Sequence, residues 1–132
     1  QQTCCGQPMA NSGCMPEARP LAEKFIDTFA GYDWIVSPSG SCVSMVRNHY
    51  DHLVSPSDTQ ATAVRRQTLE LGEFLVQVLG IRSPAGVFPH KVGLHQSCHG
   101  LRELRLGPCS ESMTPRDSLL QQLLGVGFQR GR

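Results

Sequence analysis

The chain has few aromatic residues, few charged residues and no long apolar run. Aromatic side chains make up 6% and charged side chains 17% of its 132 residues, and the formal net charge is +1. So small a net charge gives no case for a nucleic acid or an anionic membrane as a partner. No apolar stretch reaches the roughly 20 residues that a transmembrane helix needs, so no membrane span is expected. The hydrophobic share of 39% is enough for the core of about one domain.

Cysteine is also too sparse for a disulfide-stabilised scaffold. Six cysteines in 132 residues fall below the fraction of about 8% that is typical of such scaffolds. The cysteines cluster in stretches rich in Gly, Ser and Pro, which fits metal ligation in a reducing compartment. Together with the lack of a signal-peptide pattern after Gln1, this predicts a cytoplasmic location.

The Cys4-Cys5-Gly6 stretch is the most informative motif. Neighbouring side chains of an extended segment point in opposite directions, so two adjacent thiols reach one point only if the backbone turns sharply. Gly6 permits such a turn because it tolerates positive φ. Turn-forming residues as far as Gly13 predict an irregular loop that suits a soft metal or an iron-sulfur cluster. A strained vicinal disulfide or two inert buried thiols are the alternatives.

The first clear helix is expected at Pro16–Ala30, because its apolar residues recur with helical spacing. A short strand is expected at Asp33–Val36, followed by a turn and a second helix that begins at Cys42. The N–H groups and dipole of that helix N-terminus favour a thiolate at Cys42 and lower its pKa. The inner face of this helix is predicted to consist of Val43, Val46, Tyr50 and Leu53.

The second half repeats this plan. A helix is expected from Thr59 to Leu79, with Arg65, Arg66, Glu70 and Glu73 on a solvated face. A strand at Lys91–His95, a tight turn and Cys98 then precede a short helix at His99–Leu104. A last helix is expected after Pro115. Buried strands that are linked by amphipathic helices predict an α/β fold, in which a short parallel sheet pairs Asp33–Val36 with Lys91–His95.

Three motifs together carry a family resemblance: Cys-Cys-Gly-Gln-Pro-Met-Ala-Asn-Ser-Gly at Cys4–Gly13, Ser-Pro-Ser-Gly-Ser-Cys at Ser37–Cys42, and His-Gln-Ser-Cys-His-Gly-Leu-Arg-Glu-Leu at His95–Leu104. They resemble the cysteine-rich (CCG) domain family, which includes iron-sulfur subunits of lactate utilization and glycolate oxidation complexes and a subunit of heterodisulfide reductase. The resemblance implies parts of two tandem repeat units. Residues 1–82 are the later part of the first unit, residues 83–90 a linker and residues 91–132 the early part of the second. The chain then looks like the middle of a longer protein.

The resemblance also implies a function and a ligand set. It points to an iron-sulfur electron-transfer subunit of a 2-hydroxy acid (L-lactate) oxidation complex, whose other subunits are its partners. Cys4, Cys5, Cys42 and Cys98 are the implied ligands of a cluster of the 4Fe-4S type. Cys98 either joins the first three thiols or belongs to a second site. Where related sites have Cys-x-x-Cys, Cys42 is followed three positions later by Met45.

Other interpretations stay open. The same cysteines suit a structural zinc site, or free thiols in an interaction domain without a cluster. A cysteine nucleophile at Cys42 is a weaker possibility, because the spacing indicates no specific base. His95 and His99 flank Cys98 and are either polar helix-start residues or metal ligands. Cys14 and Cys109 match no ligand position of the family and are expected to be free thiols.

Overall fold

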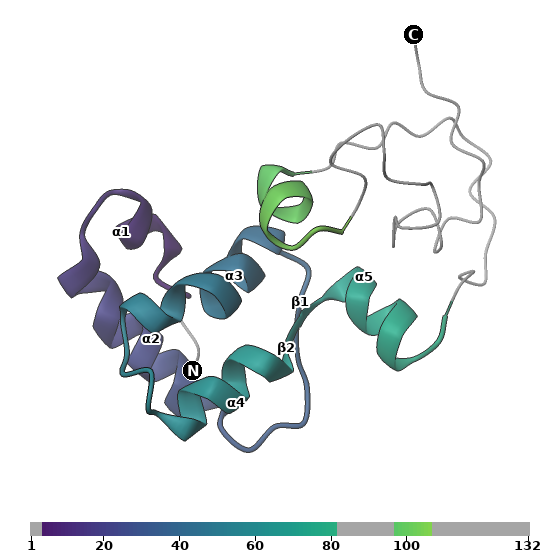
Figure 1. Ribbon diagram of the computed structural model, residues 1–132, viewed down its shortest axis with the longest axis horizontal. Helices are drawn as coiled ribbons and strands as arrows, with labels where there is room; N and C mark the ends of the chain where they lie inside the picture. The colour runs from purple at the N-terminus through teal and green to yellow at the C-terminus, as the bar shows by residue number, and fades with distance from the viewer. Residues whose placement is uncertain (1–3, 82–96, 107–132) are drawn as a thin grey trace, which may run out of the picture. The chain divides into compact units, whose positions relative to one another are not determined.

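The computed structural model describes residues 4–81 and 97–106, and the chain divides into two compact units, Gln1–Glu70 and Leu71–Arg132 (Figure 1). The described elements of the first unit are α1 (Gln7–Asn11), α2 (Met15–Phe29), β1 (Ile35–Ser37), α3 (Gly40–Ser44), the π-helical turn η1 (Met45–His49), the 3₁₀ turn η2 (Tyr50–His52), α4 (Thr59–Gln67) and β2 (Thr68–Glu70). Those of the second are α5 (Leu71–Glu73) and the π-helical turns η3 (Phe74–Val78) and η4 (His99–Glu103).

The helix α2 follows its apolar periodicity. Ala18, Ala22, Phe25 and Ile26 are buried along one face, as the spacing of apolar residues predicts. One proline stands at the helix start and Pro20 lies inside the helix, close enough to the N-terminus to be tolerated. The helix ends at Phe29, two residues before Gly31, whose φ is 85°. The predicted helix at Pro16–Ala30 is therefore confirmed within a residue at each end.

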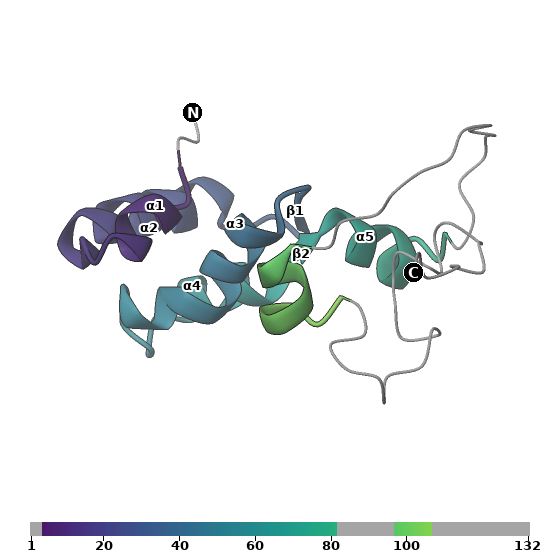
Figure 2. The ribbon, with the colours of Figure 1, turned by 90° about the horizontal axis from the view of Figure 1, so that it is seen from above.

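The sheet consists of two short parallel strands, β1 and β2, which lie side by side in both views (Figures 1 and 2). Ile35 pairs with Thr68, Val36 with Leu69 and Ser37 with Glu70. The predicted α/β class with a parallel sheet is confirmed. The predicted partner strand at Lys91–His95 lies outside the described residues, as do the linker at 83–90 and the helix after Pro115.

The single helix predicted from Thr59 to Leu79 is wrong, because β2 interrupts it. The helix α4 ends at Gln67, and the next residue, Thr68, has extended φ and ψ of −84° and 118°. The buried Thr68 hydroxyl donates a hydrogen bond of 2.7 Å to the carbonyl of Val64, in the last turn of α4. β-Branched residues favour strands, and backbone pairing with β1 outweighs the helical periodicity of the apolar residues at this point.

The core of the first unit joins α2 to the helix that follows Cys42. Phe25 stacks at a tilt on Phe29, with ring centroids 4.5 Å apart, and meets the Tyr50 ring edge-on at 5.9 Å. Val43, Val46, Tyr50 and Leu53 are all buried, which confirms the predicted inner face. The same cluster includes Cys5, and Cys4 and Cys42 pack against it. The three thiols thus lie in or against the buried core of this unit.

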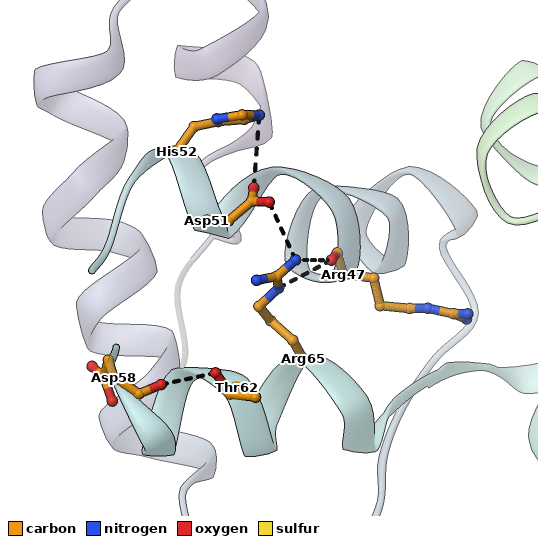
Figure 3. A network of polar contacts seen from close by, with 6 residues as sticks. All are labelled: Arg47, Asp51, His52, Asp58, Thr62 and Arg65. Atoms are coloured by element: carbon orange, nitrogen blue, oxygen red, sulfur yellow. Dashed lines mark hydrogen bonds and ion pairs between the residues drawn. The ribbon is translucent and has the colours of Figure 1, made fainter. Parts of the chain in front are cut away.

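Polar contacts tie α4 to η1 and η2 (Figure 3). The Arg65 guanidinium donates two hydrogen bonds, of 3.0 and 2.9 Å, to the carbonyl oxygen of Arg47 and lies 3.5 Å from the Asp51 carboxylate. The prediction that Arg65 and Glu73 belong to a solvated face is wrong: Arg65 satisfies a carbonyl of a neighbouring element, and Glu73 is only 5% exposed.

No helix among the described residues is long and apolar enough to cross a membrane.

Candidate thiol site

The Cys-Cys-Gly stretch makes the sharp turn that its sequence predicts. Gly6 has a φ of 85° and stands at the N-terminus of α1. A Cβ at Gly6 would lie 3.2 Å from the Ala18 carbonyl oxygen in α2, so the turn is both left-handed and closely packed. The expectation that residues up to Gly13 form an irregular loop is wrong, because Gln7–Asn11 is helical. Pro8 lies in the first turn of α1, where a proline helps a helix to begin.

Cys42 lies near the Cys-Cys-Gly turn, although it is distant from that turn in the sequence. It lies in the first turn of α3, directly after β1 and the serine-rich turn, as predicted. Cys42 and Cys5 line one cavity of about 500 Å³, and the Cys42 side chain helps to raise the pKa of the Cys5 thiol. A strand–turn–helix path therefore brings together two cysteines that are 37 positions apart in the sequence.

Cys4 and Cys42 both pack against the core cluster that contains Cys5. Burial raises the pKa of the Cys5 thiol to about 12, and the neighbouring Cys42 and Cys4 side chains add to that shift. The thiol of Cys5 is therefore neutral in the metal-free protein, whereas a bound metal ion would deprotonate a coordinating thiol. Cys4 and Cys42 are only partly buried, while Cys5 is 3% exposed. The three thiols thus differ in how readily solvent reaches them.

Tyr50 belongs to this site, although sequence reasoning placed it only in the core. Its hydroxyl donates a buried hydrogen bond of 3.0 Å to the Cys5 carbonyl oxygen. Burial raises the pKa of Tyr50, and the neighbouring Cys5, Cys4 and Cys42 side chains raise it further. The sequence signal was the spacing: Cys42, Val46 and Tyr50 recur every four residues, and residues four apart share one face of a helix.

The donor set fits a thiophilic group in its chemistry. Two thiols in contact, with a third nearby, are soft ligands of the kind that zinc and iron-sulfur clusters take. Within residues 4–81 and 97–106, however, no group of three or more His, Cys, Asp or Glu side chains is arranged so that it could hold a metal ion. Coordination of a metal therefore requires Cys4 to turn toward the Cys5–Cys42 pair, or further ligands to join that pair.

The remaining cysteines have other surroundings. Cys98 is exposed and precedes η4 in the second unit. Beside it, His99 Nε2 lies 3.9 Å from Glu103 Oε1. Cys14 is a partly buried free thiol near the start of α2, and its sulfur faces the carbonyl of Ser12 at 3.9 Å. His95 and Cys109 lie outside the described residues.

Comparison with known proteins places these features in a family. Residues 1–47, which contain the Cys-Cys-Gly turn and Cys42, match the model of the cysteine-rich domain family CCG. The chain is 43% identical over 109 residues to lactate utilization protein A of Exiguobacterium sp., and the match covers 79% of this chain and 44% of the relative. No solved structure matches the chain significantly.

Two further relatives cover nearly the whole chain. Lactate utilization protein A of Bacillus subtilis is 38% identical over 130 residues, which is 96% of this chain and 52% of the relative. The protein of the same name from Halalkalibacterium halodurans is 38% identical over 131 residues, which is 98% of this chain and 51% of the relative. The chain therefore spans about half the length of the curated relatives that it matches. The resemblance based on the three motifs is confirmed: residues 1–47 match the cysteine-rich domain model CCG, and the chain is similar to relatives named lactate utilization protein A at 38–43% identity.

Proposed function

We propose that this chain is the thiol-bearing part of an iron-sulfur subunit that serves 2-hydroxy acid oxidation. The observation that carries the proposal is that Cys5 of the Cys-Cys-Gly turn and Cys42 at the start of α3 line one cavity, while Cys4 packs against the same core cluster. Soft thiolates at a strand–helix boundary are suitable ligands for an iron-sulfur cluster, which supplies one-electron transfer when it is bound. Cys4, Cys5 and Cys42 are its proposed ligands in the first unit.

The substrate class and the partners follow from the relatives' name, lactate utilization protein A. We infer that L-lactate or a similar 2-hydroxy acid is oxidised on another subunit, and that this chain relays the electrons. The proposed partners are therefore the other subunits of a lactate or glycolate oxidation complex.

The decisive experiment is anaerobic reconstitution of the chain with iron and sulfide, followed by analysis of iron and acid-labile sulfide. We expect a brown protein with broad visible absorption that contains both elements. If the protein stays colourless and binds zinc instead, the thiols form a structural metal site rather than a cluster site. A protein that binds neither would leave the thiols as part of an interaction domain and would contradict the proposal.

Matched cysteine variants locate the ligands. Cys42→Ser removes one member of the contacting pair, so we expect iron incorporation to fall to a small fraction of that of the unmodified chain. Cys14→Ser is the control, because Cys14 is also partly buried and in the first unit, but its sulfur faces the Ser12 carbonyl rather than the thiol pair. Equal iron content in both variants would contradict the assignment of Cys42 as a ligand.

Cys98 needs its own test, because it belongs to the second unit. We propose it as a further cluster ligand, since it repeats the Ser-Cys-helix pattern of Ser41-Cys42. If it joins Cys4, Cys5 and Cys42, Cys98→Ser lowers the iron content of the reconstituted chain. If the iron content stays unchanged, Cys98 is not a ligand of the first site. The assignment of residues 1–82, 83–90 and 91–132 to two repeat units likewise remains a proposal.

A further inference from the structure

A cavity of about 500 Å³ opens beside the thiol pair, and the proposed cluster ligands Cys5 and Cys42 account for only a small part of its lining. Its volume falls within the range of about 300–1,000 Å³ that is usual for small-molecule sites. The described lining residues all belong to the first unit, and most of them come from α2, β1, α3, η1 and β2. The described lining residues are Cys5, Phe25, Phe29, Tyr32, Trp34, Ile35, Val36, Ser37, Pro38, Cys42, Val43, Val46 and Thr68.

The lining residues differ systematically in exposure. Tyr32, Trp34 and Val36 are 58%, 49% and 38% exposed, so they form the rim. Cys5 and Val43 are buried and form the floor together with other core residues. The rings of Phe29 and Tyr32 meet edge-on, with centroids 6.1 Å apart. An open aromatic rim above a packed floor admits a ligand from solvent and contacts it with ring faces and edges.

The polarity of the lining defines the chemistry of the ligand. None of the described residues that line the cavity carries a charge. The hydroxyl group of Thr68 donates to Val64, and that of Ser37 accepts from the backbone of Ser39, so both are already engaged within the protein. A charged ligand would lose its hydration there without gaining an ionic partner. Aromatic rings and polarizable sulfur instead favour a neutral, planar aromatic molecule.

We propose that this cavity is a binding site for a neutral, planar aromatic small molecule, which lies between Trp34 at the rim and the Cys5–Cys42 pair at the floor. The binding itself requires no metal. The consequence for electron transfer rests on the proposed function. A small molecule in this cavity would touch Cys5 and Cys42, which are proposed to bind the cluster. An aromatic electron carrier would therefore meet the cluster at this cavity.

The test compares two aromatic probes of the same shape on the full, metal-free chain. The neutral probe is 2-naphthamide and the anionic probe is 2-naphthoate. Binding is followed by amide chemical-shift changes in two-dimensional NMR and by the fluorescence of Trp34, the chain's one tryptophan. We expect saturable binding of 2-naphthamide, with shifts confined to the lining residues, and binding of 2-naphthoate that is at least about tenfold weaker.

Two matched variants separate this cavity from general hydrophobic adsorption. Val36→Glu places a charge at the rim, whereas Met15→Glu places the same charge at a comparably exposed apolar residue, 43% exposed, in the same unit but outside the cavity. We expect Val36→Glu to weaken 2-naphthamide binding at least about tenfold and Met15→Glu to leave it unchanged. Circular dichroism verifies that both variants are folded.

Three results would overturn the inference: no saturable binding, equal binding of the two probes, or equal binding to the two variants. Iron content after reconstitution is measured in parallel on the same proteins. In the unmodified chain, absent aromatic binding with normal iron content contradicts the cavity proposal alone, whereas absent iron with normal aromatic binding contradicts the proposed function alone.

Discussion

At Gly6, backbone conformation and packing constrain the residue independently. Its φ of 85° disfavours any side chain, and a Cβ would lie 3.2 Å from the Ala18 carbonyl oxygen. Gly31 has the same φ with nothing within 4 Å of its Cβ position. We expect Gly31→Ala to lower the free energy of unfolding by about 1 kcal/mol, from the left-handed conformation alone. Gly6→Ala should cost roughly 1–2 kcal/mol more, because Ala18 must also move.

Urea denaturation of both variants measures this difference. Reconstitution with iron provides a second readout, because Gly6 directly follows the two proposed ligands Cys4 and Cys5. Gly6→Ala should lower iron incorporation and Gly31→Ala should not. Equal losses of stability in the two variants would show that the close approach of Gly6 to Ala18 does not add to the free-energy cost of the substitution.

The Tyr50 hydroxyl carries the second prediction at this scale. It donates a buried hydrogen bond of 3.0 Å to the Cys5 carbonyl oxygen. Tyr50→Phe keeps the ring against Phe25 but leaves that carbonyl without this donor, so we expect a loss of about 1–2 kcal/mol in the free energy of unfolding. Tyr32→Phe is the control, since Tyr32 is exposed, and its effect should stay below about 0.5 kcal/mol. Thermal or urea unfolding distinguishes the two.

Among the elements, α4 depends most clearly on one cap. The Asp58 carboxylate accepts hydrogen bonds from the backbone N–H groups of Gln60 and Ala61, at 2.9 and 3.0 Å. We expect Asp58→Ala to lower the free energy of unfolding by about 1 kcal/mol, and Asp58→Asn to lose much less, because asparagine is also a good N-cap. Urea denaturation of the two variants measures the difference. If both substitutions cost the same, the capping geometry does not contribute to stability.

The elements also show where sequence patterns stop being informative. The helix α2 and the inner face after Cys42 were predictable, because several apolar residues with helical spacing specify one buried face. The strand β2 was not, because three residues are too short to show alternation and lie inside a helical pattern. The contact of Cys5 with Cys42 followed from the strand–turn–helix topology. The positions of the Cys4 and Tyr50 side chains near the other thiols depend on side-chain packing, which a local sequence pattern does not predict.

At the scale of the whole molecule, the described core cluster of the first unit is built from residues that precede Glu70. The buried cluster that includes Cys5, Phe25, Tyr50 and Val64 lies entirely before β2, and β2 itself ends at Glu70. Both strands of the described sheet and three of the four proposed ligands are in this unit. The first unit therefore contains the elements that a small domain needs to fold by itself.

We expect a fragment of residues 1–70 to fold cooperatively, with a free energy of unfolding of roughly 3–5 kcal/mol, as befits so small a core. Tyr50→Phe supplies the internal check, because its hydrogen bond to Cys5 and its packing on Phe25 are contained in the fragment. The substitution should therefore destabilise the fragment by the same amount as the full chain, within about 0.5 kcal/mol. Urea denaturation followed by Trp34 fluorescence measures both quantities. A fragment without a cooperative transition, or one insensitive to Tyr50→Phe, would show that residues after Glu70 are needed to complete this core.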